Sequence, residues 1–235
     1  MTTHHQATSQ IRIVQCWDDG VLDDIRLTEL LRRHGATATF NLNPGLHGPT
    51  RSEPWHYKEI KDVQRLARAE LVSVYDGFTI ANHTVSHPWP LKIPLSDWRA
   101  EVFDGRRHLQ DIFQQPILGF AYPFGQHDEA TAAVVAEAGH SYARTCKNAT
   151  PCHPATNAFF QPTDCHHADP DFWERYEQAK SAGSSVFYFW GHSFEFLNDA
   201  DWDAYEAKLK RFNQDPEATW GELPDLFPNG SATAC

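Results

Sequence analysis

The 235-residue sequence has no cluster of basic residues and no long apolar segment. Lysine and arginine number 20 against 31 aspartates and glutamates, which gives a formal net charge of −11. Without basic patches the chain is a poor partner for nucleic acid or an anionic membrane, and it would repel strongly anionic substrates. No apolar run approaches the roughly 20 residues of a membrane span. We therefore expect a neutral or cationic small-molecule or oligosaccharide substrate, with no nucleic-acid or membrane partner. The oligomeric state is left open.

Disulfide frameworks and secretory signals are also missing. The five cysteines stand at positions 16, 146, 152, 165 and 235, an odd number that is typical of reduced thiols in the cytoplasm. The N-terminal segment is polar and lacks the apolar core of a signal peptide. Both observations predict a cytoplasmic protein, although a secreted protein whose signal had been removed would look the same.

No repeat, low-complexity tract or Gly/Ser linker divides the chain, and 41% of its residues are hydrophobic, enough to bury a core. We expect a loosely ordered N-terminus over 1–10, one domain over 11–228 and a frayed tail over 229–235.

Strand-like and helix-like segments alternate along this domain. Strands are expected over 11–17, 37–42, 78–82, 117–122, 141–145 and 186–190, and helices over 21–34, 58–69, 96–114, 128–138, 169–182 and 201–212. Ser96 is expected to cap its helix, residues 147–168 to form a long irregular loop, and Trp220 to lie in a short helix. This alternation predicts parallel βαβ units and an α/β fold, for which a barrel is an ordinary solution at this length.

Residues suited to catalysis or ligand binding lie at or just after the ends of five of the predicted strands: Asp18/Asp19, Asn41/Asn43, His83/His87, Pro123/Phe124 and His192. The carboxyl ends of barrel strands converge on one face, where active sites form. Two carboxylates and three histidines there would suffice for a divalent metal with three protein ligands, a base and an acid.

Each of these motifs has a structural alternative. Asp18 and Asp19 are also typical of a polar turn in which Asp19 caps the next helix. His83 and His87, four residues apart, would share a metal from one face of a helical turn, or they are two surface histidines among 14. His192 follows an apolar strand and would otherwise be a core histidine bonded to a backbone carbonyl.

Four segments match the motifs of one family in order and approximate spacing: Cys-Trp-Asp-Asp-Gly (16–20), His-Thr-Val-Ser-His (83–87), Ala-Tyr-Pro-Phe-Gly (121–125) and Trp-Gly-His (190–192). They resemble the Thr-Phe-Asp-Asp-Gly, His-Ser/Thr-x-x-His, Arg-x-Pro-Tyr/Phe and Leu-x-His motifs of the polysaccharide deacetylases, the NodB-homology carbohydrate esterases. The resemblance covers about residues 11–200.

This resemblance implies a distorted (β/α) barrel and a metal-dependent hydrolase that removes an acetyl group from an N- or O-acetylated saccharide by attack of a metal-bound water. It assigns Asp19, His83 and His87 to the metal, usually zinc, with cobalt, nickel or iron(II) as alternatives. It makes Asp18 the base and His192 the acid that protonates the departing amine. The oxyanion and substrate contacts would come from Tyr122, Pro123, Phe124 and Trp190.

The chain departs from the family pattern in two places. The arginine that pairs with the base is Ala121 here, and its loss would raise the pKa of Asp18. Arg144, at the end of the next predicted strand, is our candidate for its replacement. The Asp-x-x-Asp-Trp motif is not recognisable, and Asp164 is our candidate for the carboxylate that orients His192. Glu195, just past His192, is either a supporting partner in the site or a surface residue.

Two further groups of residues have open interpretations. The 147–168 loop and its flank carry six soft or imidazole side chains: Cys146, Cys152, His153, Cys165, His166 and His167. They would form a second zinc site, or the loop would cover the pocket and contribute a histidine or Asp164 to it. Trp17, Trp89 and Trp190 flank the motifs and would line a saccharide groove or pack in the core.

Three functions remain under consideration. The first is deacetylation of a saccharide. The second is hydrolysis of another small amide or formamide by the same groups, which a cytoplasmic location favours. The third is a carbohydrate-binding protein that has lost turnover, for which Ala121 is the only support.

Overall fold

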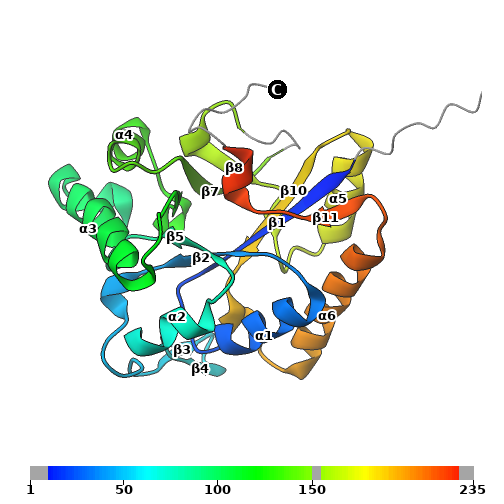
Figure 1. The fold of residues 1–235 in the computed structure, drawn as a ribbon, viewed down its shortest axis with the longest axis horizontal. Helices are drawn as coiled ribbons and strands as arrows, with labels where there is room; N and C mark the ends of the chain where they lie inside the picture. The colour runs from blue at the N-terminus through cyan, green and yellow to red at the C-terminus, as the bar shows by residue number, and fades with distance from the viewer. Residues whose placement is uncertain (1–9, 150–154, 228–235) are drawn as a thin grey trace, which may run out of the picture.

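The computed structural model describes residues 10–149 and 155–227. They form a nearly closed barrel of parallel strands surrounded by helices, as predicted (Figure 1). The strand order is β8 (Gln161–Thr163), β7 (Tyr142–Asn148), β6 (Gly119–Ala121), β5 (Thr79–Asn82), β2 (Thr39–Leu42), β1 (Ile11–Asp18), β10 (Val186–Gly191) and β9 (Cys165–His166). A further strand, β11 (Ala218–Trp220), pairs with the start of β1.

The α-helices are α1 (Asp24–His34), α2 (Leu71–Val74), α3 (Leu95–Phe113), α4 (Glu129–Glu137), α5 (Phe172–Ser181) and α6 (Asp199–Gln214). Among the described residues, each helix is too short or too polar to span a bilayer.

β1 is the central strand of the barrel. It pairs with β10 from Arg12 to Trp17 and with β2 from Cys16 to Asp18, and all its residues except Arg12 are buried. A parallel strand covered on both faces needs an almost continuous apolar sequence, which Ile11–Trp17 largely provides. Asp18 is therefore a charged residue at the end of a strand with no exposed face.

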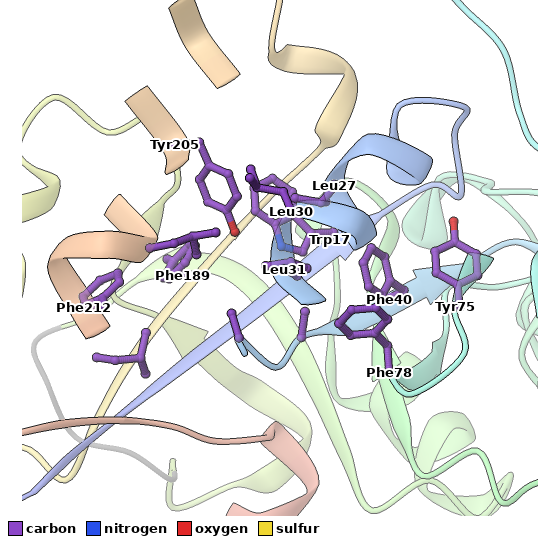
Figure 2. Packing of buried hydrophobic residues seen from close by; sticks show 14 of the residues in the cluster. Trp17, Leu27, Leu30, Leu31, Phe40, Tyr75, Phe78, Phe189, Tyr205 and Phe212 are labelled. Carbon is purple, nitrogen blue, oxygen red and sulfur yellow. The ribbon is translucent and has the colours of Figure 1, made fainter. Parts of the chain in front are cut away.

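The largest hydrophobic cluster fills the space between the sheet and the helices α1 and α6 (Figure 2). Trp17 lies fully buried in it, with Leu27 and Leu31 of α1 on one side and Tyr205 of α6 edge-on at 5.2 Å. Burying each such side chain contributes about 1.5–3 kcal/mol. Trp17 is therefore a core residue, and the interpretation of it as part of a saccharide groove is wrong.

Residues 161–166 close the barrel. β8 pairs with β7 and β9 pairs with β10, and only Asp164 separates the two short strands. The Asp164 amide donates to the carbonyl of Tyr188 at 2.7 Å, and the Tyr188 amide donates to Asp164 Oδ2 at 2.8 Å. The Asp164 carboxylate thus takes the place of a backbone carbonyl where the chain passes from one neighbour to the other. The expected irregular loop over 147–168 is wrong for this part of the segment.

Three other expectations about local structure are wrong. Residues 58–69 form no α-helix. Residues 58–63 form the turn and second strand of a hairpin, β3 (Trp55–Tyr57) and β4 (Lys61–Val63), and a short 3-10 helix, η2 (Arg68–Glu70), begins at Arg68. Lys58 and Glu59 have positive φ in the hairpin turn, and Val63 is buried against Phe194, so tertiary packing overrides the helix propensity of this segment.

The other two wrong expectations concern Trp220 and Ser96. Trp220 belongs to β11 rather than to a helix, because β1 has an unpaired edge there that the segment fills. Ser96 lies inside α3, which begins at Leu95 after Pro94.

We predict that Asp164→Ala lowers the free energy of unfolding by about 1–3 kcal/mol, because it leaves the buried Tyr188 amide without its acceptor. Asp164→Asn keeps an oxygen acceptor and should retain most of the stability. Urea denaturation of the three proteins measures this, and equal stability of the alanine variant and the wild type would contradict the proposed closure.

Candidate active site

A cavity of about 380 Å³ lies at the carboxyl ends of the barrel strands. Its lining is Asp18, Asp19, His83, His87, Tyr122, Phe124, Cys146, Trp190, His192 and Phe194. Of the residues predicted to contact substrate, Pro123 is buried in the turn η4 (Pro123–Gly125) and does not line the cavity. The others do, although the Tyr122 hydroxyl donates away from it to the Phe159 carbonyl at 3.1 Å.

Asp19, His83 and His87 form a group with metal-ligand spacing. One ligand atom from each lies within 4.8 Å of the other two. His83 Nδ1 donates to the Ala121 carbonyl at 2.7 Å, which leaves the lone pair on Nε2. Burial lowers the pKa of His83 to about 4 and also lowers that of His87, so both imidazoles are neutral near pH 7.

The carboxylate of this group also suits a cation. Asp19 Oδ1 is buried and accepts no hydrogen bond from the described residues. Burial alone would raise the pKa of Asp19, but the charges of His192 and Arg65 lower it, so the group is ionised. One carboxylate and two neutral imidazoles fit a divalent metal such as zinc, with room for a further ligand.

The two histidines do not meet by the predicted route. Residues 83–87 are not helical, and Thr84 and His87 have positive φ values of 70° and 59°. Thr84 Oγ1 accepts from the His87 amide at 3.0 Å, and Asn43 donates to the carbonyls of His83 and Thr84. The helical-turn expectation is wrong because this hydrogen-bonded turn brings the rings to 4.7 Å by another path.

Strained backbone concentrates at this cavity. Asp19 and Phe124 have φ values of 85° and 56°, so four non-glycine residues of the site motifs adopt the left-handed region. The Phe124 ring stacks on Trp89 at 3.7 Å and meets His87 edge-on at 4.6 Å. Lys92 Nζ covers Trp89 at 3.9 Å from its ring. Trp89 therefore packs on Phe124, which in turn contacts His87.

Asp18 is buried between a cation and an amide. Arg144 forms an ion pair with Asp18 Oδ2, and Asn41 Nδ2 donates to Oδ1 at 2.7 Å. Burial alone would raise the pKa of Asp18, but the charge of Arg144, assisted by that of His192, holds it well below its ordinary value. Arg144 is the register partner of Ala121 on the neighbouring strand, so the cation reaches this carboxylate from one strand further along the sheet.

His192 faces the same space from β10. Its Nε2 lies 4.0 Å from Asp18 Oδ2 and 3.8 Å from Asp19 Oδ2. Burial disfavours its charged form, yet the carboxylates of Glu195, Asp19 and Asp18 outweigh that and raise the pKa of His192 to about 9. The carboxylate facing Nδ1 is Glu195, at 3.4 Å, and not Asp164, whose carboxylate binds the Tyr188 amide. Glu195 thus occupies the place that the sequence assigned to Asp164.

Several supporting residues escaped sequence reasoning. Arg65 donates to the Asp19 carbonyl at 2.5 Å, and its Nη1 is 3.6 Å from Asp19 Oδ1. Asp24 accepts from Ser193 Oγ at 2.5 Å and from Tyr75 at 2.6 Å, which anchors the residue after His192 to α1. Burial raises the pKa of Asp24 to about 7. Only the position of Ser193, next to a motif histidine, marked any of them in the sequence.

The predicted cysteine–histidine zinc site does not form among the residues described. Cys152 and His153 lie outside the described residues. Over 10–149 and 155–227, the second group with metal-ligand spacing is His166, His167 and Glu195, without a cysteine. Cys165 is buried and Cys146 Sγ accepts from Arg144 Nη1 at 3.1 Å.

Comparison with protein families gives one match. Residues 5–143 match the family model described as polysaccharide deacetylase. No curated protein matches the chain.

Solved structures share the fold. A family 4 carbohydrate esterase from Streptomyces lividans in complex with acetate is 15% identical, with a TM-score of 0.60 and coverage of 97% of this chain and 99% of that one. The deacetylase PplD from Streptococcus pyogenes is 20% identical, with a TM-score of 0.53 and coverage of 63% and 61%. A mutant of BA3943, a CE4 family pseudoenzyme with restored activity, is 15% identical, with a TM-score of 0.59 and coverage of 94% and 68%.

Several of the similar structures belong to longer chains, of which this chain covers only part. The chain spans 61% of PplD and 44% of each of two other polysaccharide deacetylases, from Bacillus cereus and Bacillus anthracis.

We predict that Arg144→Ala lowers kcat/KM roughly 10- to 100-fold at neutral pH, because Asp18 loses the cation that keeps it ionised and in place. The unpaired buried carboxylate should also cost about 3–5 kcal/mol of stability. Activity assays and urea denaturation measure the two effects. Arg26→Ala, which breaks the exposed pair with Asp199, is the control and should shift stability by about 0.5 kcal/mol or less. An unchanged rate in Arg144→Ala would contradict the role of this residue.

Proposed function

The chain belongs to the polysaccharide deacetylase family, and from this premise we propose that it removes an acetyl group from an N-acetylated saccharide with one divalent metal ion. The family consists of hydrolases that act on carbon–nitrogen bonds other than peptide bonds. The observation that carries the proposal is the convergence of Asp19, His83 and His87 with Asp18 and His192 on one cavity.

The proposed roles follow from the charge state of each group. Asp19, His83 and His87 would hold the metal, most favourably zinc, which supplies a Lewis acid that lowers the pKa of water and polarises the acetyl carbonyl. Asp18, ionised beside Arg144, accepts the proton of the attacking water at Oδ2. His192 gives a proton from Nε2 to the leaving nitrogen as the carbon–nitrogen bond breaks. Acetate and the free amine are the products.

The substrate contacts come from the aromatic part of the cavity. Trp190 and Phe194 line it beside His192. Aromatic side chains suit the apolar face of a sugar ring. The absence of a strong positive field fits a neutral substrate of this kind.

A second candidate is hydrolysis of another small amide by the same groups. The observation that favours it is the cavity volume of about 380 Å³, near the lower end for small-molecule sites. Loss of turnover has less support, because Arg144 supplies the cation that Ala121 lacks.

We predict that a chelator abolishes acetate release from an acetylated chito-oligosaccharide and that zinc or cobalt restores it. Asp18→Asn should retain the metal and lose roughly 10²- to 10⁴-fold in kcat, because only the base is removed. His83→Gln should lose the metal itself, because it removes one of three ligands. Metal content and acetate release measure these outcomes.

Assays of the metal-loaded wild type on small amides and on the oligosaccharide separate the alternatives. Turnover of small amides but not of the oligosaccharide would select the second candidate. Sugar binding without acetate release by the metal-loaded wild type would contradict both hydrolase proposals.

A further inference from the structure

Glu195 has an unusual number of imidazole neighbours. It lies in the turn η6 (Ser193–Glu195), and its Oε2 is 2.9 Å from His166 Nε2 and 2.9 Å from His167 Nε2. Oε2 also accepts from the His192 amide at 3.0 Å. The other oxygen, Oε1, faces His192 Nδ1 at 3.4 Å.

The hydrogen-bond pattern shows a carboxylate held by imidazole donors rather than a metal site. We call this group, Glu195 with His166 and His167, the carboxylate platform. The Ala168 amide donates to His166 Nδ1 at 3.2 Å, so the proton of a neutral His166 is on Nε2, which then donates to Glu195. A nitrogen that carries a proton has no lone pair for a metal. The three donors converge on Oε2 and leave Oε1 free for His192.

The surrounding fold holds this platform in place. His167 is almost fully buried, and its ring packs so closely on Gly191 that a Cβ there would lie 2.2 Å from His167 Cδ2. Lys208 of α6 donates to the His167 carbonyl at 2.5 Å. Burial alone would raise the pKa of Glu195, but the three histidines hold it well below its ordinary value, so the carboxylate is ionised.

We propose that Glu195, fixed by His166 and His167, is the positioning residue that keeps a proton on His192 Nδ1 and directs Nε2 at the leaving group. This inference rests on the proposed function of His192 as the acid. Without a fixed acceptor at Nδ1 the ring can rotate, and the Nε2 proton then no longer points at the leaving group. At 3.4 Å the contact with Oε1 is long, and such contacts shorten when substrate is bound.

The leaving group provides the decisive test. A departing sugar amine must be protonated, whereas 4-nitrophenolate leaves without a proton. We predict that Glu195→Gln lowers kcat on an acetylated chito-oligosaccharide roughly 10- to 100-fold with little change in KM. The rate on 4-nitrophenyl acetate should change little. Glu195→Asp keeps the charge and should recover part of the loss.

A matched control exists in the same chain. Glu70 also stands at the third position of a short turn, η2 (Arg68–Glu70), and accepts from the backbone amide of Ala67 at 2.8 Å. Its partner is Arg51 instead of an imidazole. Glu70→Gln therefore removes an equivalent carboxylate and should leave both rates unchanged.

A spectroscopic measurement tests the inference without turnover. In the zinc-loaded wild type, the Nδ1 proton of His192, assigned by its loss in His192→Gln, should resonate downfield in proton NMR. In Glu195→Gln it should move upfield or disappear. Equal losses on both substrates at unchanged metal content, or a wild type without this resonance, would overturn the role of Glu195. So would a second metal ion per chain that His166→Gln removes.

These results distinguish the inference from the proposed function. If the metal-loaded wild type cleaves neither substrate, the proposed function fails, while the Nδ1 resonance still reports on the contact between Glu195 and His192.

Discussion

Two carboxylates buried at the end of the central strand dominate this structure. Asp18 and Asp19 are 2% and 8% exposed, and charges so far from water are tolerated only with partners. Arg144 and Asn41 satisfy Asp18, whereas one oxygen of Asp19, beside two neutral imidazoles, accepts no hydrogen bond within 10–149 and 155–227. The unsatisfied oxygen is the feature that calls for a cation, because the rest of the barrel end is already arranged around negative charge.

The need to pair buried charges also explains the residues that surround Asp18 and His192. Arg144 belongs to β7 and stands level with Ala121 of β6, so the arginine has changed strand while its guanidinium still reaches Asp18. Adjacent parallel strands in register make such an exchange geometrically simple. On the other side of the cavity, Glu195 and two histidines form a second charged layer behind His192. Each reacting group thus has its own buried partners, and the fold must bring these partners together from several different strands.

The closed barrel maintains the strained backbone at the cavity. Asp19, Thr84, His87 and Phe124 hold left-handed conformations at the ends of three strands, which only a well-packed scaffold can maintain. The scaffold includes the cluster around Trp17 and the segment around Asp164, where a side chain completes the sheet between β7 and β10. Residues whose substitution would not touch the cavity therefore determine whether its geometry persists.

The sequence by itself determined the alternation of strands and helices, the barrel and the carboxyl-end placement of Asp18, Asp19, His83, His87 and His192, because period, apolar runs and motif order are local properties. It also placed Arg144 near Asp18, since that needed only strand order. Tertiary structure decided the hairpin over 55–63, the non-helical turn between His83 and His87, the closing role of Asp164 and the pairing of His192 with Glu195. These depend on which distant groups compete for the same buried hydrogen bonds, and local sequence does not encode that competition.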